Sequence, residues 1–300
     1  MEKKVVSYDT LEQNIEFFKT MYEVVRIVDP LMKRVIKYDS NGMLETEDLC
    51  HDCWGKNKIC DNCISIRAFL QNDALMKLEY TLNKIYMVTA IPIETDKRSV
   101  VLELLNDVTK SMLFKSDNYS DIKELKNIIN HLNSLIVKDT ITNLFNKRYI
   151  NERLPVDIIK GVLEEEPLSI IILDIDEFKE VNDTYGHLVG DEAIKLLGEV
   201  LDNLTTYCKG WAARYGGDEF IIVLNNTSQE EAYDFSEQLR KTIETSILEI
   251  NDIKINITAS FGMHTMFKEK LTSNELIDLA DKNLYKAKKE GKNKVVTNNY

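Results

Sequence analysis

Residues 214–220 read RYGGDEF and lie between the apolar stretches WAA and IIVL. Gly216 and Gly217 can both adopt positive φ values, so we expect a tight hairpin turn between two strands, WAARY and FIIVL. Asp218 and Glu219 then begin the returning strand, in which neighbouring side chains point to opposite faces. Taken alone, the stretch is typical of a solvated acidic turn, because a short motif is a weak indicator of function.

A second acidic position favours a functional interpretation of this hairpin. Asp174 ends the apolar run LSIIILD, where an unpaired buried carboxylate would be costly. If this strand lies beside the hairpin, Asp174 and Asp218 can converge on one Mg²⁺ ion, which prefers oxygen ligands. Paired acidic residues hold the metal in many phosphoryl-transfer sites. The two stretches together therefore predict metal-assisted phosphate chemistry.

Length and charge narrow the classes of protein to consider. The chain has 300 residues, enough for two domains with separate cores. Its formal net charge of −12 favours neither a nucleic-acid partner nor an anionic membrane surface. The N-terminus lacks the apolar core of a signal peptide and the longest apolar runs are strand-sized, so we expect no membrane segment and a cytoplasmic location. Structural disulfides are then not expected among the five cysteines.

The residue pattern divides the chain into three regions and predicts a mixed fold class, α+β or α/β. Residues 1–109 contain short β-rich runs around a helical stretch near CISIRAFL, which predicts an antiparallel sheet with helices on one side. The segment of this region that ends in LLNDVT resembles the last strand of a PAS sensor domain. Residues 110–138 are polar and helical in pattern, and we expect them to form a linker. In residues 139–300 strands alternate with helices, which predicts a central sheet flanked by helices.

The expected linker helix carries apolar residues at alternating steps of three and four. These residues are Ile122, Leu125, Ile129, Leu132 and Ile136. This spacing is that of a two-helix coiled-coil seam. The alternative is a single amphipathic helix that packs on its own domain, since the pattern spans barely two heptads.

At this point the sequence resembles a known family. DIDEFKEVNDTYGHLVGD, followed downstream by RYGGDEF, is similar to the GGDEF domain of diguanylate cyclases, which condense two GTP molecules into cyclic di-GMP and pyrophosphate. The resemblance covers residues 139 to about 297, from DTITNLFNKR to LYKAKKEGKNKV. It implies a palm-like nucleotidyl-cyclase sheet and a homodimer in which two domains face each other. From the apolar spacing of the linker helix we hypothesise that two such helices pair in parallel, so that the N-terminal sensor regulates activity through the dimer geometry. The alternative is a catalytically silent receptor that binds GTP or cyclic di-GMP to control a partner.

The resemblance also implies a metal site and catalytic residues. Mg²⁺ or Mn²⁺ would be held by the side chains of Asp174 and Asp218 and by the carbonyl of Ile175. Asp218 would in addition accept the proton of the attacking 3′-hydroxyl. Glu219 is the second catalytic candidate, in contact with a second metal ion or with the ribose.

Substrate binding is assigned to a further set of positions by the same resemblance. These are Phe178, Lys179, Asn182, His187, Asp191, Lys288 and Lys292. Backbone amides near Glu177 would cradle phosphates at a strand-to-helix turn, and the three lysines would neutralise the triphosphate. Lys292 stands where the family commonly has arginine, so the charge remains but bidentate binding is lost. Asn182 and Asp191 would read guanine, although Asp191 alone also fits an N-cap of the helix that begins GDEAIKLL.

One feature of many family members is missing. Their inhibitory RxxD site for cyclic di-GMP is replaced here by Tyr207, Cys208, Lys209 and Gly210, which supply neither the guanidinium nor the carboxylate. We therefore expect weak or absent inhibition by the product through this loop.

The N-terminal region contains a cysteine cluster, CHDCWGKNKICDNC. Cys50, Cys53, Cys60 and Cys63 form two CxxC pairs, and four thiolates can surround a tetrahedral Zn²⁺ ion or hold an iron–sulfur cluster. His51 could replace one of the thiolates. A third possibility is that the thiols bind no metal and act as a redox switch or as packing.

Overall fold

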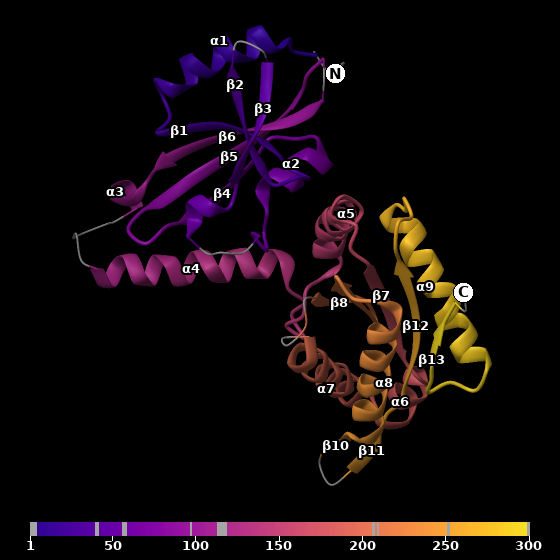
Figure 1. Ribbon diagram of the computed structural model, residues 1–300. Helices are drawn as coiled ribbons and strands as arrows, with labels where there is room; N and C mark the ends of the chain where they lie inside the picture. The colour runs from indigo at the N-terminus through magenta and orange to yellow at the C-terminus, as the bar shows by residue number, and fades with distance from the viewer. Residues whose placement is uncertain are drawn as a thin grey trace. The chain divides into compact units, whose positions relative to one another are not determined.

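The computed structural model describes residues 5–39, 42–55, 59–96, 98–112, 119–205, 208, 210–250 and 253–298 (Figure 1). The chain divides into two compact units, Met1–Ile136 and Val137–Tyr300. Each unit combines helices with a β-sheet, which confirms the expected mixed fold class.

The first unit is built on a six-stranded sheet with the order β3-β2-β1-β6-β5-β4. All neighbouring strands in it are antiparallel, as expected. The strands are β1 (Val24–Asp29), β2 (Arg34–Asp39), β3 (Gly42–Leu49), β4 (Leu75–Tyr80), β5 (Ile85–Glu94) and β6 (Ser99–Asp107). The helices are α1 (Tyr8–Lys19), the 3₁₀ helix η1 (Asp52–Trp54), α2 (Ile64–Gln71), α3 (Thr109–Met112) and α4 (Tyr119–Val137).

Helices cover both faces of this sheet, so the expectation of helices on one side is wrong. Ile64 of α2 packs with Val101 of β6 on one face. Leu11 of α1 packs with Val100 and Leu102 on the opposite face. The reason lies in β6, whose consecutive residues are apolar, because a strand that points apolar side chains to both faces needs cover on both.

Helix α4 packs on its own unit through one side and exposes a row of apolar side chains on another. Ile129 is buried, whereas Leu132 is 51% exposed, so the predicted seam residues do not share one environment. Ile128 and Leu135 are also about half exposed, at 48% and 53%. We call Ile128, Leu132 and Leu135 the α4 stripe. The side chain of Ile122 lies outside the described residues, and pairing of two such helices stays a prediction.

The second unit contains a five-stranded sheet with the order β13-β12-β7-β9-β8 and a separate two-stranded sheet, β10-β11. The strands are β7 (Leu168–Ile175), β8 (Gly210–Gly216), β9 (Glu219–Asn225), β10 (Ile247–Ile250), β11 (Ile253–Asn256), β12 (Ala259–Met266) and β13 (Val295–Thr297). The helices are α5 (Lys147–Glu164), α6 (Phe178–Tyr185), α7 (His187–Thr205), α8 (Gln229–Thr245) and α9 (Ser273–Lys289). Among the described helices of the whole chain, none is both long and apolar enough to cross a membrane.

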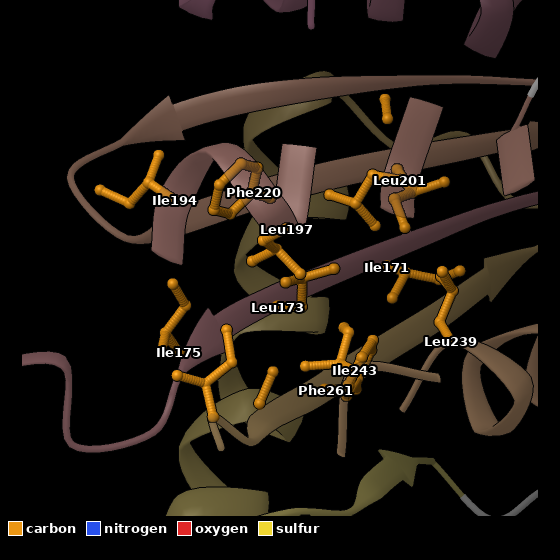
Figure 2. Packing of buried hydrophobic residues seen from close by; sticks show 14 of the residues in the cluster. Ile171, Leu173, Ile175, Ile194, Leu197, Leu201, Phe220, Leu239, Ile243 and Phe261 are labelled. Carbon is orange, nitrogen blue, oxygen red and sulfur yellow. The ribbon is translucent and has the colours of Figure 1, made fainter. Parts of the chain in front are cut away.

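The central strand β7 is buried along its whole length, because helices cover both faces of the sheet. Figure 2 shows Leu173 of β7 packed among side chains of α7 and α8, including Leu197 and Ile243. Helix α9 lies against neighbouring β12, where Gly262 permits close approach: a Cβ there would lie 2.0 Å from the backbone nitrogen of Leu284. This packing fixes the end of β7 at which Asp174 lies.

Candidate active site

The hairpin predicted from RYGGDEF is present and lies beside the strand that carries Asp174. Strands β8 and β9 pair across a turn in which Gly217 has a φ of 54°, a left-handed conformation that favours glycine. Strand β9 pairs antiparallel with β7, so that Glu219 is the direct register partner of Asp174. The acidic turn and the end of the buried strand therefore meet at one edge of the sheet.

Asp174 has an unusual electrostatic environment. Its carboxylate is buried, and its Oδ2 lies 2.7 Å from Nζ of Lys288 in α9. Burial raises the pKa of Asp174 to about 6; the ammonium of Lys288 acts to lower it, whereas the charges of Asp218 and Glu219 raise it further. The site thus gathers more negative charge than one lysine balances.

This surplus of negative charge fits a divalent cation held by Asp174 and Asp218, as the family resemblance implied. In the described part of the chain, no group of three or more His, Cys, Asp or Glu side chains forms a metal cage. A site with two carboxylates and the Ile175 carbonyl needs no such cage, because substrate phosphates and water commonly complete the shell of Mg²⁺.

A helix begins directly beside these carboxylates. Glu177 has a φ of 58° and turns the chain from β7 into α6, so the free N–H groups of the first helical turn lie next to the site. Phe178 packs on the hydrophobic core, and Lys179 is exposed. Lys292 approaches the same turn, with its Nζ 2.6 Å from Oε1 of Glu177. The corner is suited to a phosphate group.

Asp176 was not among the predicted site residues, but its hydrogen bonds hold this corner in place. Its buried carboxylate accepts hydrogen bonds from the hydroxyls of Thr258 and Ser260, at 2.7 and 2.6 Å, and from the backbone N–H of Asn293 at 3.0 Å. These bonds tie the end of β7 to the start of β12 and to the turn that carries Lys292. Alternation of side chains along a strand would place Asp174 and Asp176 on the same face, and this pattern was the one signal for Asp176 in the sequence. The pattern is a weak guide here because β7 ends at Ile175, before Asp176.

The two predicted guanine-reading positions lie at one corner between α6 and α7. Asn182 is half-buried, and a Cβ on Gly190 would come within 2.0 Å of its Oδ1, so glycine leaves the space that Asn182 occupies. Asp191 follows Gly190 and is exposed. Helix α7 begins at His187, which is also exposed, so Asp191 lies inside the helix and the alternative assignment as an N-cap is wrong.

The four cysteines of the first unit are not arranged around a metal site. The absence of a metal-holding group in the described residues includes them, so zinc and iron–sulfur ligation gain no support. Cations contact two of the sulfurs instead: Arg26 Nη1 lies 3.2 Å from Cys53 Sγ, and Lys33 Nζ lies 3.3 Å from Cys63 Sγ. Positive side chains at these sulfurs disfavour a metal cation in the same place.

The loop with the missing inhibitory site is described only in part. Tyr207 and Lys209 lie outside the described residues. Cys208 is half-buried, and its thiol donates to the carbonyl of Leu204 at 3.6 Å.

Comparison with known proteins agrees with the geometry. The second unit has a central sheet flanked by helices, with acidic residues at a strand end, and this fold matches that of solved GGDEF domains. A family model described as "Diguanylate cyclase, GGDEF domain" matches residues 136–294, more than half of the chain. The chain therefore belongs to the GGDEF family.

Individual relatives extend this comparison. Diguanylate cyclase A of Treponema denticola is 32% identical over 243 residues, which cover 75% of this chain and 62% of that protein. Diguanylate cyclase DosC of Escherichia coli is 37% identical over 159 residues, 52% of this chain and 34% of that protein. The crystal structure of the GGDEF domain of DgcB from Caulobacter crescentus, in complex with c-di-GMP, superposes with a TM-score of 0.52 at 27% identity and covers 54% of this chain and 93% of that chain. The chain thus spans less than two thirds of the length of these curated relatives.

Proposed function

We propose that the second unit is a diguanylate cyclase that converts two GTP molecules into cyclic di-GMP and two pyrophosphates. The observation that carries this proposal is the buried Asp174 beside Asp218 and Glu219, with Lys288 at 2.7 Å. In each of two equivalent steps, a 3′-oxygen bonds to the α-phosphorus of the other GTP and pyrophosphate leaves. The 3′-hydroxyl loses its proton in the same step.

The side chains at the site divide this work between them. Asp174, Asp218 and the Ile175 carbonyl would hold Mg²⁺ or Mn²⁺, which supplies charge stabilisation for the phosphate undergoing attack. Asp218 at the hairpin turn would accept the 3′-hydroxyl proton, and Glu219 pairs in register with Asp174 at the same end of β7.

Three lysines would neutralise the triphosphate. Lys288 and Lys292 already approach the carboxylates of Asp174 and Glu177, and Lys179 lies in the first turn of α6. Fixed positive charge at the position where phosphate charge develops lowers the barrier, because it needs no rearrangement during the reaction.

Selection of GTP is assigned to Asn182 and Asp191. A carboxylate can accept hydrogen bonds from both N1–H and the N2 amino group of guanine, whereas adenine offers no donor at N1. The exposed carboxylate of Asp191, next to the close contact between Gly190 and Asn182, supports this role.

We further propose that the active form is a homodimer regulated by the first unit, a PAS-like sensor. The α4 stripe spaces Ile128, Leu132 and Leu135 by four and three residues, which is the seam spacing of a two-helix coiled coil. A change in the sensor that alters how two α4 helices meet would alter how two GTP sites face each other.

Leu132→Glu should then convert dimer to monomer and abolish synthesis at low protein concentration, while Asn127→Glu on the same helix should not. A wild-type chain that sediments as a monomer and is fully active under the same conditions would contradict the dimer.

The activity is tested by incubating the purified chain with GTP and Mg²⁺ and identifying the product by mass spectrometry. We expect cyclic di-GMP and pyrophosphate from the wild type and none from Asp174→Asn. Asp234→Asn, an exposed position on α8, is the matched control for loss of one carboxylate. Binding of GTP without any product in the wild type would overturn the assignment.

A further inference from the structure

The second CxxC pair of the first unit lies beside a buried lysine. Cys63 is 9% exposed and Lys33 is 5% exposed, and the ammonium of Lys33 donates to the sulfur of Cys63 at 3.3 Å. Cys63 is also the N-cap residue of α2, at the end of the helix where free N–H groups favour negative charge. Two independent features therefore stabilise a thiolate at this one position.

The four thiols differ in acidity. Burial and the carboxylate of Glu103 act to raise the pKa of Cys63, but Lys33, the backbone N–H of Ile66 and Lys77 outweigh them, so the pKa lies below the ordinary value. Lys77 is itself paired with Glu79 at 2.9 Å, so the direct contact of Lys33 is the main support for the thiolate. Burial raises the pKa of Cys60 to about 12 and also raises those of Cys50 and Cys53. Since the thiolate is the reactive form of cysteine, the contact with Lys33 favours Cys63 over the other three thiols as the reacting sulfur.

Cys60 lies across a short turn from Cys63. Residues 61 and 62 form a turn between the two cysteines. The ends of a four-residue turn lie within about 7 Å of each other, which overlaps the separation that a disulfide requires. The first CxxC pair has different contacts. Cys53 is exposed, its thiol donates to the carbonyl of Cys50 at 3.4 Å, and its sulfur contacts Arg26.

We propose that Cys60 and Cys63 form a redox-active dithiol that a small hydroperoxide oxidises to an intramolecular disulfide. The sulfur of Cys63 attacks the terminal peroxide oxygen, the O–O bond breaks, and Cys63 becomes a sulfenic acid while an alcohol leaves, or water when the oxidant is hydrogen peroxide. The sulfur of Cys60 then attacks Cys63, the S–O bond breaks, and a disulfide and water are formed. The sulfurs lose two electrons and the peroxide gains them. The burial of Cys63 favours a small oxidant over a bulky disulfide.

The turn between the two cysteines contacts the helix that leads to the second unit. Asn62 donates through Nδ2 to Oδ1 of Asn133 on α4 at 2.8 Å. Its backbone carbonyl accepts from Lys77 at 2.8 Å, and its Oδ1 accepts from Arg67 at 2.9 Å. A disulfide closes the ends of this turn and removes the negative charge that faces Lys33. We therefore expect oxidation to weaken the hold of Asn62 on α4.

The disulfide is tested by mass spectrometry on the full chain. Tryptic peptide 59–67 contains Cys60 and Cys63 but no other cysteine, because Lys58 and Arg67 bound it. After treatment with hydrogen peroxide we expect this peptide to lose two hydrogen atoms and to regain them with a dithiol reductant. Cys60→Ser should stop at the sulfenic acid, which dimedone traps on Cys63, and Cys208→Ser should behave as the wild type.

The cation is tested separately with Lys33→Met. Removal of the ammonium raises the pKa of the Cys63 thiol, so we expect roughly tenfold slower peroxide consumption. An unchanged rate, an unmodified peptide 59–67 in the wild type, or stoichiometric zinc or iron that Cys63→Ser fails to retain would each overturn the proposal. The last result would instead establish a metal site.

Transmission is tested by hydrogen exchange in α4. We expect oxidation to increase exchange in α4 of the wild type, and we expect no such increase in Asn133→Ala, which still forms the disulfide. Asn127→Ala, exposed on the same helix, is the matched control. We also expect oxidation to change the rate of cyclic di-GMP synthesis, and this expectation alone rests on the proposed function. If the disulfide forms but the rate of synthesis does not change, the redox site still stands. Equal exchange before and after oxidation in the wild type would refute the coupling to α4.

Discussion

The carboxylate cluster around Asp174 and the thiol cluster around Cys63 are built from similar parts with opposite charge balance. Asp174 is buried with one lysine, Lys288, and the like charges of Asp218 and Glu219 raise its pKa. Cys63 is buried with Lys33 and Lys77 nearby, and its pKa is lowered. In the first cluster two further carboxylates act on Asp174 against one lysine, whereas in the second cluster a lysine contacts the sulfur directly. A divalent cation is therefore expected at the carboxylates, and an anionic sulfur is expected at the thiols.

The largest expected effect comes from removing the charge of Asp174. Asp174→Asn should lower cyclic di-GMP synthesis by roughly 1000-fold or more, because it removes a metal ligand from a phosphoryl-transfer site. The same change should stabilise the fold at neutral pH. A carboxylate with a raised pKa contributes most to stability below its ordinary pKa, and that contribution is lost as the pH rises through about 6.

The asparagine variant escapes this loss, so its free energy of unfolding should rise by about 1–2 kcal/mol at neutral pH, after allowance for the partly exposed Lys288 that loses its partner. Kinetics and urea unfolding of the two proteins measure both effects, with Asp234→Asn as the control. A variant that is inactive and also less stable would show that Asp174 is mainly structural.

The second prediction concerns the pH dependence of cation binding. Only the ionised carboxylate of Asp174 holds a cation, and its pKa is about 6. The Mg²⁺ concentration for half-maximal activity should therefore stay constant above about pH 7 and rise up to tenfold per unit below about pH 6. Titrations of Mg²⁺ between about pH 5 and pH 8 give this curve. A flat dependence would place the cation away from Asp174.

A smaller effect is expected from Asp176, which holds the site without facing it. Asp176→Asn weakens the bonds to Thr258, Ser260 and Asn293, and hydrogen bonds to a charged group contribute about 1.5–3 kcal/mol each before relaxation. Because the turn with Lys292 loosens, KM for GTP should rise about five- to tenfold while kcat changes less. Steady-state kinetics separate the two constants. A fall in kcat with constant KM would mean that Asp176 acts on the reacting atoms instead.

The comparison also shows which features the sequence could predict. The hairpin and the position of Asp174 depend on local signals, a glycine pair and an apolar run, and the structure has both where expected. The contact of Lys33 with Cys63 joins residues thirty positions apart, and that of Asp176 with Asn293 joins residues 117 positions apart. No local pattern predicts such contacts. The start of α7 at His187 was missed because the more obvious helical pattern begins at Gly190.

The smallest expected effect is product inhibition through the segment after α7. The four residues that replace RxxD there supply neither the guanidinium nor the carboxylate of that motif. Cyclic di-GMP carries two phosphates, and Lys209 is the one charged side chain among Tyr207, Cys208, Lys209 and Gly210. A single lysine binds phosphate weakly compared with a bidentate arginine. We therefore expect the initial rate of synthesis to change by less than about twofold in micromolar cyclic di-GMP, because the guanidinium and the carboxylate of RxxD are both missing. Strong inhibition that disappears in Lys209→Ala would show that this loop binds the product through contacts other than the missing pair.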